Sequence, residues 1–175
     1  MSVDALRMRR SSAALSTLLA AVLLTPLATP ASAAGNDYPY RGDAVSRSDR
    51  WGFTTRQCVS FVAWRLAQKN RPLSNATQKW GNAGHWDETA RARKVVVTTK
   101  PKVGAVAHWN PNETSRFYPS GGGTGTLTAG AVGHVAYVAA VHSDGSVRIE
   151  QYNLSGNRSY SVMRVKAPRY LYLGG

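Results

Sequence analysis

The hydrophobic period of this chain changes once, near residue 95, and this change limits the fold more than any other feature. Before it, apolar residues at helical spacing predict a helix over residues 57–68, capped by Thr54 or Thr55. A second helix is expected over 82–94. After it the period is two, which is typical of strands. The predicted strands cover residues 95–97, 104–109, 132–141, 146–152, 160–165 and 170–173. Helices first and antiparallel strands after predict an α+β fold, with the helices packed on a mostly antiparallel sheet.

The segment 110–130 joins two of these predicted strands and is rich in glycine. It contains Gly121-Gly122-Gly123 and Gly125. Long connections without regular structure are often lids or binding loops. We therefore expect a loop here, either functional or an insertion of no consequence.

The chain begins with the pattern of a secretory signal peptide. Three arginines within the first ten residues precede an apolar stretch from Ala13 to Ala28, and Ala31-Ser32-Ala33 follows. This order predicts cleavage after Ala33 and a secreted or wall-associated product. The pair Arg9-Arg10 leaves Sec and Tat export both open. The predicted parts are a signal peptide (1–33), an N-terminal arm (34–50) and a single catalytic domain (51–175).

The formal net charge of +13 is spread along the chain, without a long run of cations. Such a charge favours polyanionic surroundings, whereas its spread argues against a dedicated nucleic-acid patch. With a secretion signal, the expected anionic partners are cell-wall polymers, acidic glycans or anionic lipid rather than nucleic acid. We expect a monomer without stable membrane insertion. No set of His, Asp or Cys has zinc spacing, so no metal or cofactor is expected.

Cys58 is the only cysteine, and it lies at the predicted start of a helix. A solitary thiol in a secreted chain cannot form an internal disulfide, and it is often reactive. The free N–H groups and positive partial charge at a helix start favour a thiolate, and they can hold an oxyanion. Gln57 could add a side-chain donor. Cys58 is therefore the candidate nucleophile, against the alternative of a buried structural cysteine.

A cysteine nucleophile needs a base, and the chain has four histidines. His134 is favoured because it follows Gly133 and opens a rigid predicted strand. Asp144-Gly145 predicts a hairpin turn, and counting outward from it places His134 roughly opposite Asn153. Asn153 or Glu150 could orient the imidazole. On a regular strand these two residues would face opposite sides.

Taken together, these segments resemble the CHAP family, the cysteine- and histidine-dependent amidohydrolases and peptidases. The resemblance covers most of residues 38–173 and is carried by Tyr38-Pro39-Tyr40, Trp51-Gly52-Phe53, Arg56-Gln57-Cys58-Val59-Ser60-Phe61-Val62-Ala63-Trp64-Arg65, Trp80-Gly81-Asn82-Ala83, Trp86, Pro101-Lys102-Val103-Gly104-Ala105-Val106-Ala107, Gly133-His134-Val135-Ala136-Tyr137-Val138 and Glu150-Gln151-Tyr152-Asn153. Many members place an acidic residue two before the asparagine, where this chain has Gln151. The resemblance therefore favours Asn153 over Glu150 as the partner of the base.

The resemblance implies a papain-like fold and hydrolysis of amide bonds in peptidoglycan. The expected activity is that of an N-acetylmuramoyl-L-alanine amidase or a peptide endopeptidase. Cys58 matches the nucleophile, His134 the base, and Gln57 a possible oxyanion donor. Trp51, Trp86 and Trp109 are candidates to line a substrate groove. The alternatives are a catalytically silent cationic wall-binding module on the same fold and an NlpC/P60-type peptidase, against which Arg56-Gln57-Cys58 argues.

Overall fold

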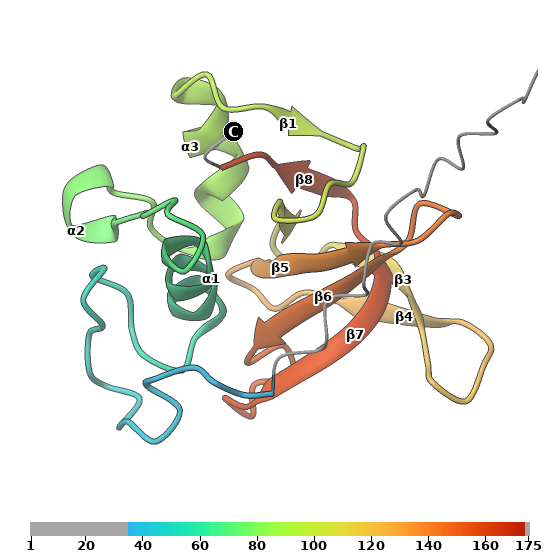
Figure 1. Ribbon diagram of the computed structural model, residues 1–175, viewed down its shortest axis with the longest axis horizontal. Helices are drawn as coiled ribbons and strands as arrows, with labels where there is room; N and C mark the ends of the chain where they lie inside the picture. The colour runs from blue at the N-terminus through green and yellow to red at the C-terminus, as the bar shows by residue number, and fades with distance from the viewer. Residues whose placement is uncertain (1–34, 174–175) are drawn as a thin grey trace, which may run out of the picture.

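The computed structural model describes residues 35–173, so the predicted signal peptide over 1–33 lies outside the described residues (Figure 1). Its helices are α1 (Cys58–Ala67), α2 (Asn75–Gln78), the 3-10 helix η1 (Ala83–His85) and α3 (Trp86–Ala92). The helix predicted over 57–68 is α1. The helix predicted over 82–94 is split into η1 and α3. No described helix is long and apolar enough to cross a membrane.

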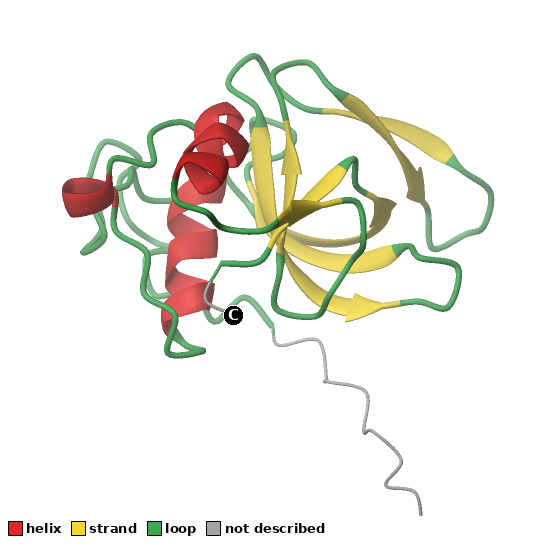
Figure 2. Cartoon of the chain, turned by 90° about the horizontal axis from the view of Figure 1, so that it is seen from above, coloured by secondary structure: helices red, strands yellow, loops and turns green. Residues whose placement is uncertain are grey.

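The eight described strands form one antiparallel sheet in the order β1-β8-β2-β5-β6-β7-β3-β4. Figure 2 shows this sheet strongly curled, with α1 alongside it. The predicted α+β class is therefore confirmed. The strands are β1 (Val97–Thr98), β2 (Val106–Trp109), β3 (Thr114–Tyr118), β4 (Gly125–Thr128), β5 (His134–Val141), β6 (Val147–Tyr152), β7 (Tyr160–Lys166) and β8 (Arg169–Leu171).

The loop expected over 110–130 is wrong, because most of this segment is the hairpin of β3 and β4. Thr114 lies opposite Thr128, and Phe117 lies opposite Gly125. The Phe117 ring covers Gly125 so closely that a Cβ there would lie 2.2 Å from its Cε1 atom. The glycines therefore form a turn and an aromatic–glycine contact within a hairpin. A glycine-rich composition alone does not distinguish these from a loop.

The curled sheet separates two hydrophobic clusters. The first joins the helices to one face of β5 and β6 and includes Phe61, Trp86, Val135 and Tyr152. The second fills the inside of the curl with side chains such as Trp109. Because successive residues of a strand face opposite sides, β5 contributes Val135 to the first cluster and Ala136 to the second. The seam between the clusters, at the start of α1 and β5, is where the chemistry-bearing residues meet.

Candidate active site

Cys58 is the first residue of α1, and the helix start is left open. Gln57 is the N-cap in an extended conformation, its side chain makes no capping hydrogen bond, and the first turn holds no acidic residue. The cap expected from Thr54 or Thr55 is therefore wrong, since the Thr55 hydroxyl donates to the Ala44 carbonyl instead. Because Gln57 does not cap the helix, the first N–H groups of α1 face the Cys58 thiol, to which those of Cys58 and Val59 are hydrogen-bonded.

The surroundings of the Cys58 thiol favour its neutral form. Burial raises its pKa, and hydrogen bonds from the backbone of Val135 and Val59 only partly oppose this effect. The contact with Val135 also places Cys58 near the candidate base in β5, because Val135 directly follows His134 in that strand. The helix start and the strand start therefore meet at one point.

His134 is buried at the start of β5, with its ring packed against Trp109 at a centroid distance of 5.8 Å. Burial lowers the pKa of His134 to about 3, against a hydrogen bond with Gln151 that raises it and the nearby His108, which lowers it further. The imidazole is therefore neutral. Its Nε2 atom is buried without a hydrogen-bond partner among residues 35–173, so the bond to Gln151 uses Nδ1.

Gly133 is required where the chain enters β5. Its φ is +75°, and a Cβ atom there would lie 2.6 Å from the Gly84 backbone in η1. The close approach presses the start of β5 against η1. It thereby fixes where the next residue, His134, emerges from the chain.

The pairing of β5 with β6 explains which neighbour His134 meets. Tyr137 lies opposite Glu150, so alternation puts Glu150 on the helix-facing side and Gln151 on the side of His134. Gln151 is a diagonal neighbour, close enough for a long side chain to reach. Gln151, which the sequence analysis did not select, is thus the residue that bonds His134. The sequence signal for Gln151 is its place two residues before Asn153, where many CHAP members have an acidic acceptor. Glutamine is not acidic, so the signal is weak.

Glu150 and Asn153 have other partners. Glu150 is buried against Arg65 of α1, with Oε2 2.6 Å from Nη2. The Asn153 amide donates from Nδ2 to Gln57 Oε1 at 2.6 Å, and its Oδ1 accepts from the Arg158 backbone N–H at 2.8 Å. Asn153 also has φ +61°, so the chain leaves the strand geometry there. Asn153 is therefore joined to the N-cap residue of α1 rather than to the imidazole.

Cys58 opens onto a cleft of about 290 Å³, which we call the catalytic cleft. It is lined by Gly52, Phe53, Thr54, Gln57, Cys58, Val59, Asn75, Gly81, Asn82, Ala83 and Val132. None of the three tryptophans expected to line a groove is among these residues. Trp86 and Trp109 are fully buried in the core, and Trp51 packs against Tyr40 elsewhere. The glycines and asparagines that do line the cleft carry little hydrophobic signal, so periodicity could not find them.

Within residues 35–173, no three His, Cys, Asp or Glu side chains gather closely enough to hold a metal ion. The second buried histidine, His108, has a structural environment. Its Nε2 lies 2.9 Å from the Ala83 carbonyl and its Nδ1 lies 3.2 Å from Arg169. A neutral ring that donates from Nε2 satisfies both contacts. Burial lowers its pKa to about 4, even though Asp87 lies nearby and raises it.

The segment that carries Cys58 and His134 matches a known family. The family model of the CHAP domain covers residues 48–153 of this chain. The chain belongs to the CHAP domain family. The match includes Cys58, His134, Gln151 and Asn153, which are the residues that the structure gathers at the seam.

Individual relatives agree with the CHAP assignment. The staphylococcal secretory antigen SsaA of Staphylococcus aureus is 31% identical over 146 residues, covering 82% of this chain and 45% of the relative. The antigen ssaA2 of the same species is 33% identical over 101 residues, or 58% of this chain and 29% of the relative. This CHAP chain therefore spans less than half the length of these curated relatives.

A solved structure shares the fold. The crystal structure of an N-acetylmuramoyl-L-alanine amidase from Staphylococcus aureus is similar with a TM-score of 0.55 and 25% identity, over 78% of this chain and 36% of the amidase chain. The expected CHAP-type α+β fold is thereby confirmed.

Proposed function

We propose that this CHAP protein is a cysteine amidohydrolase or peptidase that cleaves amide bonds in peptidoglycan. The observation that carries the proposal is the position of Cys58, whose thiol lines a cleft at an uncapped helix start and contacts the residue after His134. The family match and the amidase with the same fold support this reaction class.

The reaction begins from a neutral pair. A raised thiol pKa and a lowered imidazole pKa both disfavour a resting thiolate–imidazolium pair. His134 therefore takes the Cys58 proton on Nε2 as sulfur attacks the amide carbonyl, and the negative charge moves to the carbonyl oxygen. His134 then gives that proton to the leaving amine as the C–N bond breaks. Water, deprotonated by the same Nε2 atom, releases the acyl group and restores the thiol.

Gln151 sets the tautomer that this mechanism requires. Its Nε2 donates to the Ser161 hydroxyl, and its Oε1 accepts from the Leu154 backbone N–H. These contacts turn the amide oxygen toward His134, so the imidazole donates from Nδ1 and keeps a lone pair on Nε2. Gln151 is thus a positioning residue that acts through the base. It takes the role expected for Asn153 or Glu150.

Asn153 acts on the other half of the site. The Arg158 N–H engages its Oδ1, so its Nδ2 faces Gln57, which must present its own oxygen. The Gln57 Nε2 donor is then left for the catalytic cleft, which Gln57 lines. Together with the first N–H groups of α1, it would stabilise the oxyanion of the tetrahedral intermediate.

The proposed setting is outside the cell. Residues 1–33 are proposed as a signal peptide removed near Ala33, and the matched Staphylococcus aureus relatives are named secretory antigens. A protein with net charge +13 is drawn to anionic wall polymers. The proposed form is a monomer.

Digestion of purified peptidoglycan under reducing conditions, with mass spectrometry of the products, tests the proposal. Wild type should create new amide-derived ends, and Cys58→Ser and His134→Ala should create none. His85→Ala is the matched control, because His85 is exposed and, among residues 35–173, its ring pairs with Glu88. Ends at the lactyl–alanine bond would identify an amidase, and ends within the peptide an endopeptidase. A wild type that yields no new ends would overturn the proposal in favour of a silent wall-binding module.

A further inference from the structure

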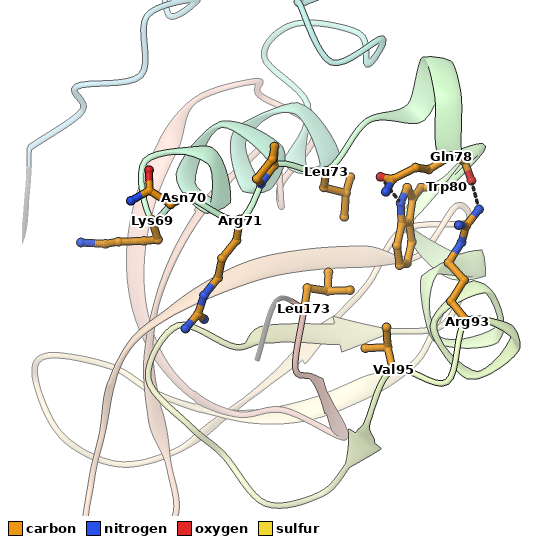
Figure 3. A pocket seen from close by; sticks show the side chains of 10 residues that line it. Lys69, Asn70, Arg71, Leu73, Gln78, Trp80, Arg93, Val95 and Leu173 are labelled. Atoms are coloured by element: carbon orange, nitrogen blue, oxygen red, sulfur yellow. Dashed lines mark hydrogen bonds between the residues drawn. The ribbon is translucent and has the colours of Figure 1, made fainter.

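A second depression, shown in Figure 3, begins just after the last residue of α1, whereas Cys58 is the first residue of that helix. We call it the basic groove, and it has a volume of about 610 Å³. Its lining residues are Lys69, Asn70, Arg71, Pro72, Leu73, Gln78, Trp80, Arg93, Val95 and Leu173. α1 has ten residues, so the two ends are about 15 Å apart along the helix axis. The basic groove shares no lining residue with the catalytic cleft.

The basic groove has three cations on its rim and an apolar floor. Figure 3 shows Arg71 and Arg93 on opposite sides of Leu173. The floor side chains Leu73, Trp80 and Leu173 are each no more than 6% exposed. The floor is therefore well packed and rigid, and the third cation, Lys69, lies on the side of Arg71.

The positive charge of the groove is not balanced by its own lining. No carboxylate of residues 35–173 lines it, and several of them are paired elsewhere, as Asp87 is with Arg91 and Glu113 with Arg169. Helices α1 and α3 end at the groove, and their carbonyl ends offset about half a charge each at most. Three cations against about one negative charge leave a site that favours an anion.

The floor restricts what kind of anion fits. The Arg93 guanidinium lies over the Trp80 ring at 5.5 Å from its centroid, and Trp80 is 3% exposed. No open aromatic face is left on which a nucleobase could stack. A slender chain in which charged groups alternate with short hydrocarbon units matches cations on two rims with an apolar strip between them. A guanidinium fork suits phosphate and carboxylate oxygens alike, and Arg93 already donates one N–H to the Gln78 carbonyl and keeps its others for a ligand.

We propose that the basic groove binds a linear, base-free phosphodiester polymer of the polyol phosphate type. Such a site would hold a wall polymer at one end of α1, while the proposed reaction would cut an amide bond at the other. The binding itself does not depend on the proposed hydrolysis, because no residue of the catalytic cleft takes part.

Calorimetric titration of the full chain with a synthetic glycerol phosphate decamer tests the proposal. The double variant Arg71→Gln/Arg93→Gln should bind at least about tenfold more weakly, and the slope of log K against log salt should shrink by about 1.4, or 0.7 for each lost contact. The matched control is Arg116→Gln/Lys166→Gln. It removes two exposed cations that face each other across β3 and β7. The control should change affinity less than about threefold.

Three results would overturn the proposal. Equal losses in the two double variants would mean that diffuse net charge binds the polymer. The assignment to a base-free phosphodiester would be overturned if single-stranded DNA with ten phosphates, or a polygalacturonate of the same charge, bound as tightly as the glycerol phosphate decamer and lost as much affinity in Arg71→Gln/Arg93→Gln. Thermal melting checks folding, and Arg71→Gln alone, which leaves the Arg93 cover on Trp80 intact, must show part of the loss. Cys58→Ser should bind like wild type, which separates this site from the catalytic proposal.

Discussion

The amide of Asn153 offers the sharpest test of the proposed oxyanion site. In the wild type it donates to Gln57 Oε1, so the Gln57 nitrogen is free for the catalytic cleft. Asn153→Asp keeps the shape of the side chain but replaces the donor by an acceptor. Gln57 should then turn its own N–H toward Asp and withdraw it from the cleft. Asn153→Ala removes the bond without replacing it.

The size of each effect follows from the hydrogen bonds involved. A hydrogen bond between two neutral amides contributes about 1 kcal/mol. In the wild type it therefore favours the orientation with the Gln57 nitrogen toward the cleft over the flipped orientation by about 5 to 1. A carboxylate that accepts from the Gln57 amide contributes about 2 kcal/mol the other way and reverses the ratio to about 1 to 30. We therefore expect kcat to fall about 25-fold in Asn153→Asp but less than about threefold in Asn153→Ala. Gln57→Ala sets the limit at about 10²-fold.

The assay is the rate of appearance of new ends from purified peptidoglycan at saturation, across the pH range, with melting temperatures for every variant. A purely structural role predicts the opposite ranking. Aspartate tolerates the +61° φ of Asn153, whereas alanine there costs about 1 kcal/mol. An Asp variant with the kcat of wild type, or a further loss when Asn153→Asp is added to Gln57→Ala, would refute the reasoning.

Three further outcomes are expected. Burial raises the pKa of Cys58 and lowers that of His134 to about 3. The rate at which iodoacetamide alkylates the thiol should therefore be low at pH 7 and rise steadily toward pH 9. A constant rate between pH 5 and pH 8 would instead indicate a resting thiolate–imidazolium pair. Gln151→Glu places a carboxylate beside the imidazole, so the pKa of His134 should rise and alkylation at pH 7 should speed up by about tenfold or more; an unchanged rate would contradict the assigned contact. Glu150→Gln leaves Arg65 with one charged partner, the exposed Asp37. Urea denaturation should therefore show that the free energy of unfolding falls by about 3 kcal/mol, while kcat of the folded fraction changes less than about twofold. A large fall in kcat at unchanged stability would indicate that Glu150 takes part in catalysis.

Periodicity was sufficient for most of the fold. The helix predicted over 57–68 is observed as Cys58–Ala67, and the strand predicted over 146–152 as Val147–Tyr152. Both elements are largely buried, because α1 packs into the first cluster and β6 contributes Val147 and Ile149 to the second cluster and Tyr152 to the first. The hairpin of β3 and β4 was missed because its faces are largely exposed, so its sequence lacks alternation.

Cys58 and His134 could be proposed as nucleophile and base from the sequence, whereas the hydrogen bond between His134 and Gln151 was not predicted. Counting from the turn places His134 opposite Asn153. The observed pairing of Tyr137 with Glu150 has the same register when it is continued to the start of β5. Counting gives the backbone register, whereas side-chain contacts also depend on where the strand ends. β6 ends at Tyr152, and the positive φ of Asn153 turns its amide toward Gln57.

The seam between the two clusters has a consequence for how activity is lost. Cys58 belongs to the cluster built by the helices, whereas the His134 ring packs on Trp109 of the cluster inside the curl. Segments of a protein can open separately, at a lower free energy than global unfolding. A loosening of the helical segment would therefore move sulfur away from nitrogen while every strand stayed paired. Mild denaturant should abolish turnover before it removes the β signal in circular dichroism, so that activity reports on the alignment of α1 with the sheet.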